Sequence, residues 1–97
     1  MEFRAPPDDQ IFYIIKSSAR SRQIYAYKDG NKNRFVCIFS KPERARELLL
    51  AKFLNCQCYP IEWADLVDRF SWQFDGFVID AVPGESCQLV FFEEAVK

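Results

Sequence analysis

The chain has 97 residues and a formal net charge of −1, and 49% of its residues are hydrophobic and 16% aromatic. This length and this hydrophobic content predict one folded domain and exclude a disordered chain. Histidine is absent, which excludes nucleophilic sites built on a Ser–His or Cys–His pair. We therefore expect no catalytic site and a protein that is not an enzyme.

Charge is sorted along the chain. Residues 16–46 carry nine Lys and Arg against two acidic residues, whereas residues 47–97 carry nine acidic residues against three basic ones. The near-neutral total therefore hides two blocks of opposite sign. Such a division predicts an electric field that steers charged partners.

The first half of the chain predicts three strands. Residues 1–10 are expected to form a flexible N-terminal arm, followed by a single α+β domain over residues 11–97. The apolar run 11–15 is typical of a strand buried on both faces. Residues 23–39 predict a β-hairpin with a loop of about four to six residues around Asp29-Gly30. In its first strand, Ile24 and Ala26 lie on one face and Tyr25 and Tyr27 on the other.

A first helix is predicted from Ser40 to about Leu54. Ser40-Lys41-Pro42-Glu43 matches a capping box, in which the Ser hydroxyl accepts the Glu N–H and the Glu carboxylate reaches back. Pro42 fits the first turn, where its missing N–H costs nothing. One apolar stripe at helical spacing is expected to face the core: Ala45, Leu48, Leu49 and Phe53.

The second half predicts a further helix and two further strands. Residues 55–60 form either a brief strand or an extended link, and Pro60 then opens a second helix. Its core stripe consists of Trp63, Leu66, Val67 and Phe70. Residues 77–81 and 88–92 are predicted strands, and Pro83-Gly84 between them suits a type II turn.

These elements predict an α+β fold with the order β-β-β-α-α-β-β. We expect a mainly antiparallel sheet of about five strands, with the two helices packed on one face.

Two segments carry a family resemblance. The run from Phe39 to Ala45, with its strand, helix cap and Pro-Glu pair, resembles a segment of bacterial SseB-type domains. Residues 76–80 followed by Pro83-Gly84 are similar to a later strand and turn of the same family. The resemblance covers about residues 35–92 and implies a small bacterial domain without a known catalytic site.

No apolar run approaches the roughly 18 residues of a transmembrane helix, and the polar N-terminus lacks the apolar stretch of a secretory signal. We therefore expect a cytoplasmic protein without a membrane partner. Its four cysteines are then expected to be free thiols that pack as small hydrophobic groups. A redox or metal role for Cys56 and Cys58 stays open as the alternative, but we expect no metal and no cofactor, because the ligand set is incomplete.

Three carboxylates bracket the last predicted hairpin: Asp75, Asp80 and Glu85. Acid–base chemistry needs carboxylates held in a pocket with separated pKa values, and the pattern does not indicate one. Asp75 and Glu85 are interpreted as turn and loop residues. Asp80 follows an apolar strand, and we expect it to pair with a basic residue of the first hairpin.

The basic block allows two kinds of partner. Cations interleaved with tyrosines can bind nucleic acid or a small molecule through hairpin 20–39, but the sequence pI of about 5.4 argues against nucleic acid. The same residue types anchor protein interfaces, and the acidic residues Glu62, Asp65 and Asp68 offer a complementary surface. We therefore predict a protein-interaction module that self-associates, as a homodimer. Its contact candidates are Arg22, Tyr25, Tyr27, Arg34 and Trp72, with Trp72 either an interface anchor or part of the core.

Overall fold

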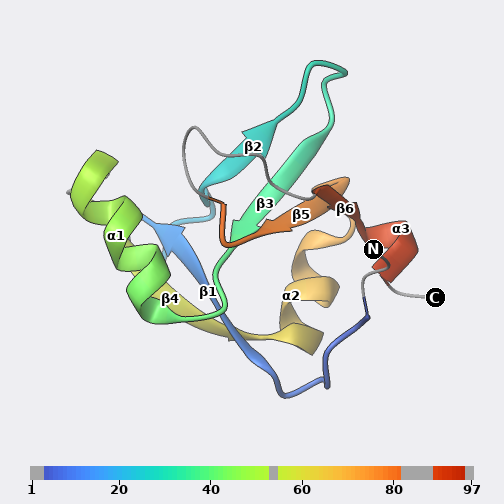
Figure 1. Ribbon diagram of the computed structural model, residues 1–97, viewed down its shortest axis with the longest axis horizontal. Helices are drawn as coiled ribbons and strands as arrows, with labels where there is room; N and C mark the ends of the chain where they lie inside the picture. Colours follow the sequence, from blue (N-terminus) through green and yellow to red (C-terminus); the bar gives the residue numbers. More distant parts are fainter. Residues whose placement is uncertain (1–3, 53–54, 82–88, 96–97) are drawn as a thin grey trace.

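The computed structural model describes residues 4–52, 55–81 and 89–95, and it has the predicted α+β class (Figure 1). The elements in chain order are β1 (Ile11–Lys16), β2 (Ala26–Lys28), β3 (Arg34–Ile38), α1 (Pro42–Lys52), β4 (Gln57–Glu62), α2 (Trp63–Phe70), β5 (Gly76–Ile79), β6 (Leu89–Phe91) and α3 (Phe92–Ala95).

The described strands form two sheets, so the prediction of one mainly antiparallel sheet of about five strands is wrong. β1 and β4 form an antiparallel pair, and the other sheet has the order β2-β3-β5-β6. Within it, β3 and β5 run parallel. The physical reason is the long connection through α1, β4 and α2, which lets the chain return and enter β5 in the direction of β3.

The two sheets touch where β1 crosses the end of β3. The backbones of Tyr13 and Phe39 exchange two hydrogen bonds of 2.9 Å, and the Tyr25 N–H donates to the Ile15 carbonyl over 2.9 Å. β1 therefore has hydrogen-bonded neighbours along both of its edges. Its side chains enter the core on both faces, as the apolar run predicted.

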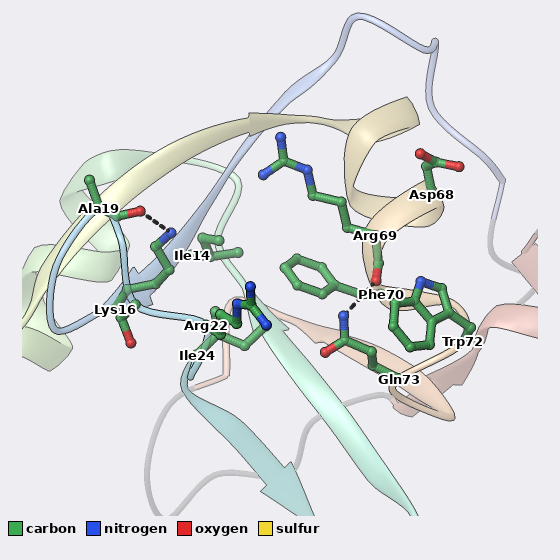
Figure 2. A pocket seen from close by; sticks show the side chains of 11 residues that line it. Ile14, Lys16, Ala19, Arg22, Ile24, Asp68, Arg69, Phe70, Trp72 and Gln73 are labelled. Carbon is green, nitrogen blue, oxygen red and sulfur yellow. Dashed lines mark hydrogen bonds between the residues drawn. The ribbon is translucent and has the colours of Figure 1, made fainter.

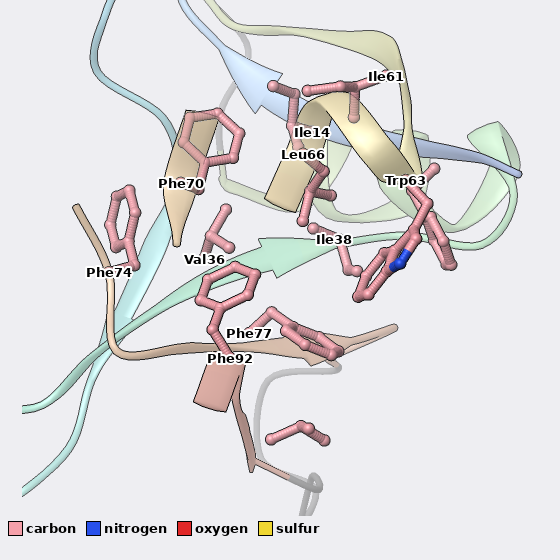
Figure 3. Packing of buried hydrophobic residues seen from close by; sticks show 12 residues of the cluster. Ile14, Val36, Ile38, Ile61, Trp63, Leu66, Phe70, Phe74, Phe77 and Phe92 are labelled. Atoms are coloured by element: carbon pink, nitrogen blue, oxygen red, sulfur yellow. The ribbon is translucent and has the colours of Figure 1, made fainter. Parts of the chain in front are cut away.

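The core has two parts, one on each side of β3. Val36 and Ile38 point towards α2, whereas Cys37 points towards α1. The two longer helices therefore lie on opposite sides of β3, and the prediction that both pack on one face of the sheet is wrong. The physical reason is that every residue from Phe35 to Phe39 is buried, so both faces of this strand must be covered. The α2-side core (Figure 3) contains Phe12, Ile14, Val36, Ile38, Ile61, Trp63, Leu66, Phe70, Phe74, Phe77, Val90 and Phe92. The α1-side core contains Ile15, Cys37, Phe39, Ala45, Leu48 and Val78.

The second helix begins later than predicted. Pro60 lies inside β4, opposite Tyr13, and α2 starts at Trp63. Pro60 is tolerated there because β4 lies at the edge of its sheet, where a missing N–H breaks no ladder. The first N–H groups of α2 are satisfied by the chain before β1: Trp63 donates to the Gln10 carbonyl (2.8 Å) and Ala64 to that of Asp8 (3.0 Å).

The hairpin prediction is confirmed. β2 and β3 pair antiparallel and are joined by residues 29–33. The Asp29 carboxylate accepts hydrogen bonds from the N–H groups of Asn31 (2.9 Å) and Asn33 (2.8 Å) and from the Asn33 side chain. Desolvation raises the pKa of Asp29, but these hydrogen bonds together outweigh it and lower the pKa below its ordinary value of 3.8.

The capping-box prediction is wrong, because Ser40 and Glu43 form no side-chain hydrogen bond with each other among the described residues. The Ser40 hydroxyl donates to one Asp80 oxygen (2.6 Å) and its N–H to the other (2.9 Å). The prediction that Asp80 pairs with a basic residue is therefore wrong, since its partner is Ser40. This contact ties the end of β3 to the end of β5. α1 begins at Pro42, within the predicted helix.

A row of aromatic rings crosses the four-stranded sheet over Gly76. Phe35 pairs with Tyr27 on one side and with Gly76 on the other, and Gly76 pairs with Phe91. The rings of Phe35 and Phe91 meet edge to face with centroids 5.3 Å apart. A Cβ at Gly76 would meet the Val90 carbonyl oxygen and lie 2.9 Å from the Phe35 ring. Only glycine fits this position.

Candidate functional site: a charged cleft beside helix α2

An open cleft of about 680 Å³ separates the loop after β1 from the C-terminal end of α2. Apolar side chains from the core form its floor, and polar and charged side chains rise around them (Figure 2). The lining residues are Ile14, Lys16, Ala19, Ser21, Arg22, Ile24, Asp68, Arg69, Phe70, Trp72 and Gln73.

The loop side of the cleft is held by local hydrogen bonds. The Ser21 N–H donates to the Ser18 carbonyl (3.1 Å), and the Ser21 hydroxyl accepts the Gln23 N–H (3.1 Å). These bonds enclose Arg22, whose side chain is exposed. Lys16, the last residue of β1, donates from Nζ to the Ala19 carbonyl (3.0 Å) and so closes the loop at its other end.

The helix side of the cleft continues past the end of α2. The Ser71 N–H still donates to the Val67 carbonyl (3.0 Å), so the helical geometry extends by one residue. The Gln73 side-chain amide donates to the Arg69 carbonyl over 3.0 Å. This bond holds the segment that carries Trp72 against the end of the helix.

The cleft is electrostatically positive. Lys16, Arg22 and Arg69 line it together with one carboxylate, that of Asp68. Among the residues that the structure describes, neither guanidinium group forms an ion pair or a side-chain hydrogen bond. Both retain donors that can bind an anionic group.

Trp72 stands at the rim of this cleft with 77% of its surface exposed. Asp65, Asp68, Arg69 and Trp72 follow one another at i, i+3, i+4 and i+7, so they share one face of the helix and its extension. Charged residues at this spacing form the polar face of an amphipathic helix, opposite the apolar stripe that packs in the core. Here the face is turned to solvent.

A second hollow, of about 310 Å³, lies next to the cleft and shares Ile14, Lys16 and Arg69 with it. Its remaining lining is apolar and acidic: Ile11, Tyr59, Pro60, Ile61, Glu62 and Asp65. The two hollows form one continuous surface, which we name the α2 face. It has a basic arm of Lys16, Arg22 and Arg69 and an acidic arm of Glu62, Asp65 and Asp68.

The structure brings together two of the five contact candidates, Arg22 and Trp72. The others lie elsewhere. Tyr25 is half-buried against the α1-side core. Tyr27 is 45% exposed beside Phe35, in the aromatic row. Arg34 sits over the Phe74 ring at 4.8 Å, which occupies its guanidinium in a cation–π contact.

The three carboxylates around the last predicted hairpin do not form a described site. Asp75 accepts the Arg34 N–H (2.8 Å) and Asp80 binds Ser40, so both join neighbouring strands. Glu85, the Pro83-Gly84 turn and Cys87 lie outside the described residues. Cys37 is buried in the α1-side core, and Cys56 and Cys58 are half-buried free thiols beside it. No group of three metal-binding side chains occurs in the part of the chain that the structure describes.

Sequence reasoning missed Arg69 and Lys16 as site residues. The helical pattern had signalled Arg69, since it completes the exposed stripe from Asp65 to Trp72. Lys16 carried no such signal. Its place in the cleft depends on how β1 crosses the sheet, which only the fold reveals.

No family model matches the chain, and no curated protein is detectably similar to it. The resemblance to SseB-type domains therefore stays a prediction. Among the described residues, no helix has both the length and the apolar character needed to cross a membrane.

Proposed function

We propose that this protein is a non-enzymatic protein-interaction module that self-associates through the α2 face. It works in the cytoplasm as a small bacterial-type domain, in line with the SseB-type resemblance. Its contact surface is the helix face from Asp65 to Trp72 with the cleft beside it.

The observation that carries this proposal is the exposure of Trp72. A tryptophan with 77% of its surface in water leaves a large apolar area unburied, and tryptophan and arginine are the residue types most enriched at binding hot spots. Arg22 and Arg69 lie around the same cleft without an ion-pair partner among the described residues. An apolar anchor surrounded by available charges is the usual composition of an interface centre and its rim.

Light scattering coupled to size-exclusion chromatography tests the proposal. We expect the mass to rise with concentration from 11.4 kDa towards twice that value, and Trp72→Ala to remain monomeric. Tyr27→Ala is the matched control, because Tyr27 is also an exposed aromatic residue but lies in the aromatic row. A wild-type chain that is monomeric at every concentration would refute self-association.

A small anionic molecule in the cleft is the second candidate function. Its volume of about 680 Å³ lies within the roughly 300–1,000 Å³ of ligand pockets, and its cations suit a phosphate or carboxylate group. In a Trp63→Phe variant Trp72 is the single tryptophan, and its fluorescence would report binding of phenyl phosphate. An unchanged emission would argue against this candidate. A nucleic acid is less favoured, because the three carboxylates of the acidic arm repel a polyanion.

A further inference from the structure

We infer that two copies of this chain meet at the α2 face across a two-fold axis that runs between the acidic arm and the basic arm. This inference rests on the proposed function and adds the arrangement of the two copies. In the resulting dimer, each acidic arm meets the basic arm of the other copy.

The first argument is the charge of the face. The two arms carry three cations and three carboxylates, and they adjoin through Lys16 and Arg69, which line both hollows. A two-fold axis between two neighbouring patches of opposite sign superposes each patch on its complement. The face is therefore complementary to itself, whereas a basic or an acidic partner would leave one arm opposite a like charge.

The second argument is that these charges do not neutralise one another within one copy. Asp65 and Arg69 stand four residues apart on α2, an order that favours an ion pair, yet within the described ranges they form none. Arg22 likewise has no carboxylate partner there. Arg22, Asp65 and Arg69 therefore remain available for contacts between copies, whereas the Lys16 ammonium binds the Ala19 carbonyl and lies over the Tyr59 ring.

The third argument is one of shape. The described chain has an apolar projection, Trp72, at the C-terminal end of the α2 stripe. It also has a hollow beside the N-terminal end of α2, lined by Ile11, Tyr59 and Pro60. Two α2 helices that cross a perpendicular two-fold axis run antiparallel, so the Trp72 end of one helix lies near the hollow of the other. Trp72 then fills the partner's hollow, and Ile11, which is 37% exposed, gains cover.

Reciprocal charge reversal tests this arrangement by sedimentation equilibrium. One variant reverses the basic arm, Arg22→Glu with Arg69→Glu, and the other reverses the acidic arm, Asp65→Lys with Asp68→Lys. Each variant alone places like charges across the axis, and we expect its dimer dissociation constant to rise at least tenfold. In an equimolar mixture both contacts become attractive again, so a heterodimer should form within about threefold of the wild-type constant.

Matched controls carry the same changes of net charge on α1. Arg44→Glu with Arg46→Glu, and Glu43→Lys with Glu47→Lys, alter exposed residues and should each dimerise like the wild type. Circular dichroism checks that every variant folds. If a double variant unfolds, the single reversals Arg22→Glu and Asp68→Lys provide the same comparison.

The outcomes separate this inference from the proposed function. Loss of the dimer in both variants, with recovery on mixing, supports the two-fold arrangement. If the wild type dimerises but the reversals change nothing, or mixing restores nothing, the charge pairing is overturned and self-association through Trp72 stands. If the wild type stays monomeric while another acidic or basic protein binds the face, the second copy is the wrong partner. If the wild type stays monomeric and the face binds no protein, both proposals fail.

Discussion

Helix α2 has a buried side and a solvent-exposed side, and one of the two tryptophans of the chain lies on each. Trp63 is 4% exposed and touches the rings of Phe12 and Phe77, whereas Trp72 is 77% exposed at the rim of the cleft. The buried side is determined by packing, because interiors are close-packed and each ring has several neighbours. The exposed side has no such constraint within one chain. On our proposal, its residues serve contacts with a second copy of the chain.

The largest expected effect is on the buried side. Trp63→Ala should lower the free energy of unfolding by about 3–5 kcal/mol, because it removes a ring at the centre of the α2-side core. Urea denaturation followed by circular dichroism measures the change. A loss below about 0.5 kcal/mol, the range of ordinary surface substitutions, would mean that the two sides of α2 do not differ as described.

A smaller loss of stability is expected at Gly76, where the sheet leaves no space for a side chain. Gly76→Ala should cost about 1–3 kcal/mol, because the added methyl group meets the Val90 carbonyl oxygen and the Phe35 ring. Gly30→Ala is the control, since a Cβ there has nothing within 4 Å. Thermal unfolding of both variants gives the comparison, and equal midpoints would contradict the close approach at Gly76.

The sequence predicted the buried side of α2 but not the pairing of the strands. The apolar spacing of α2 located Trp63, Leu66 and Phe70 in the core, and all three are buried. Pairing between distant strands was not predictable in this way. A parallel β3–β5 pair and an antiparallel one need the same buried residues, so residue patterns do not distinguish them.

The candidate site was predictable only in part. Arg22 and Trp72 were singled out as residue types that anchor protein interfaces, and the fold brings them to one cleft. The other three candidates are of the same residue types but lie outside the cleft. Tyr25 packs against the α1-side core, Tyr27 lies beside the Phe35 ring, and Arg34 lies over the Phe74 ring. Residue type indicates a contact surface. The fold decides which of its members lie together.

A weaker, pH-dependent effect is expected from Asp29, a half-buried loop carboxylate with fixed hydrogen-bond partners. The pKa of Asp29 is lowered in the folded state relative to 3.8. Its carboxylate therefore adds stability that is fully present above pH 3.8 and is lost as the pH falls through the folded-state pKa. Asp29→Ala should be less stable than the wild type near neutral pH, and the difference should shrink in acid. Urea titrations at several pH values test this, and a difference that grows in acid would contradict the lowered pKa.

The smallest effect on stability is expected from salt. Salt should affect the contacts of the exposed side of α2 and leave the packing of its buried side unchanged. The six charges of the α2 face form no ion pairs among the described residues, so their screening should leave the unfolding free energy of the monomer almost unchanged. The contacts that we propose across the two-fold axis should respond to salt, because raising the ionic strength from about 0.15 M to 1 M shortens the Debye length from about 8 Å to about 3 Å. We therefore expect the dimer to weaken in high salt while the dilute monomer unfolds at the same urea concentration. Sodium chloride is a suitable salt for this test, since sulfate also strengthens apolar burial. A dimer that is insensitive to sodium chloride would leave Trp72 as the main anchor and would remove the charged arms from the contact.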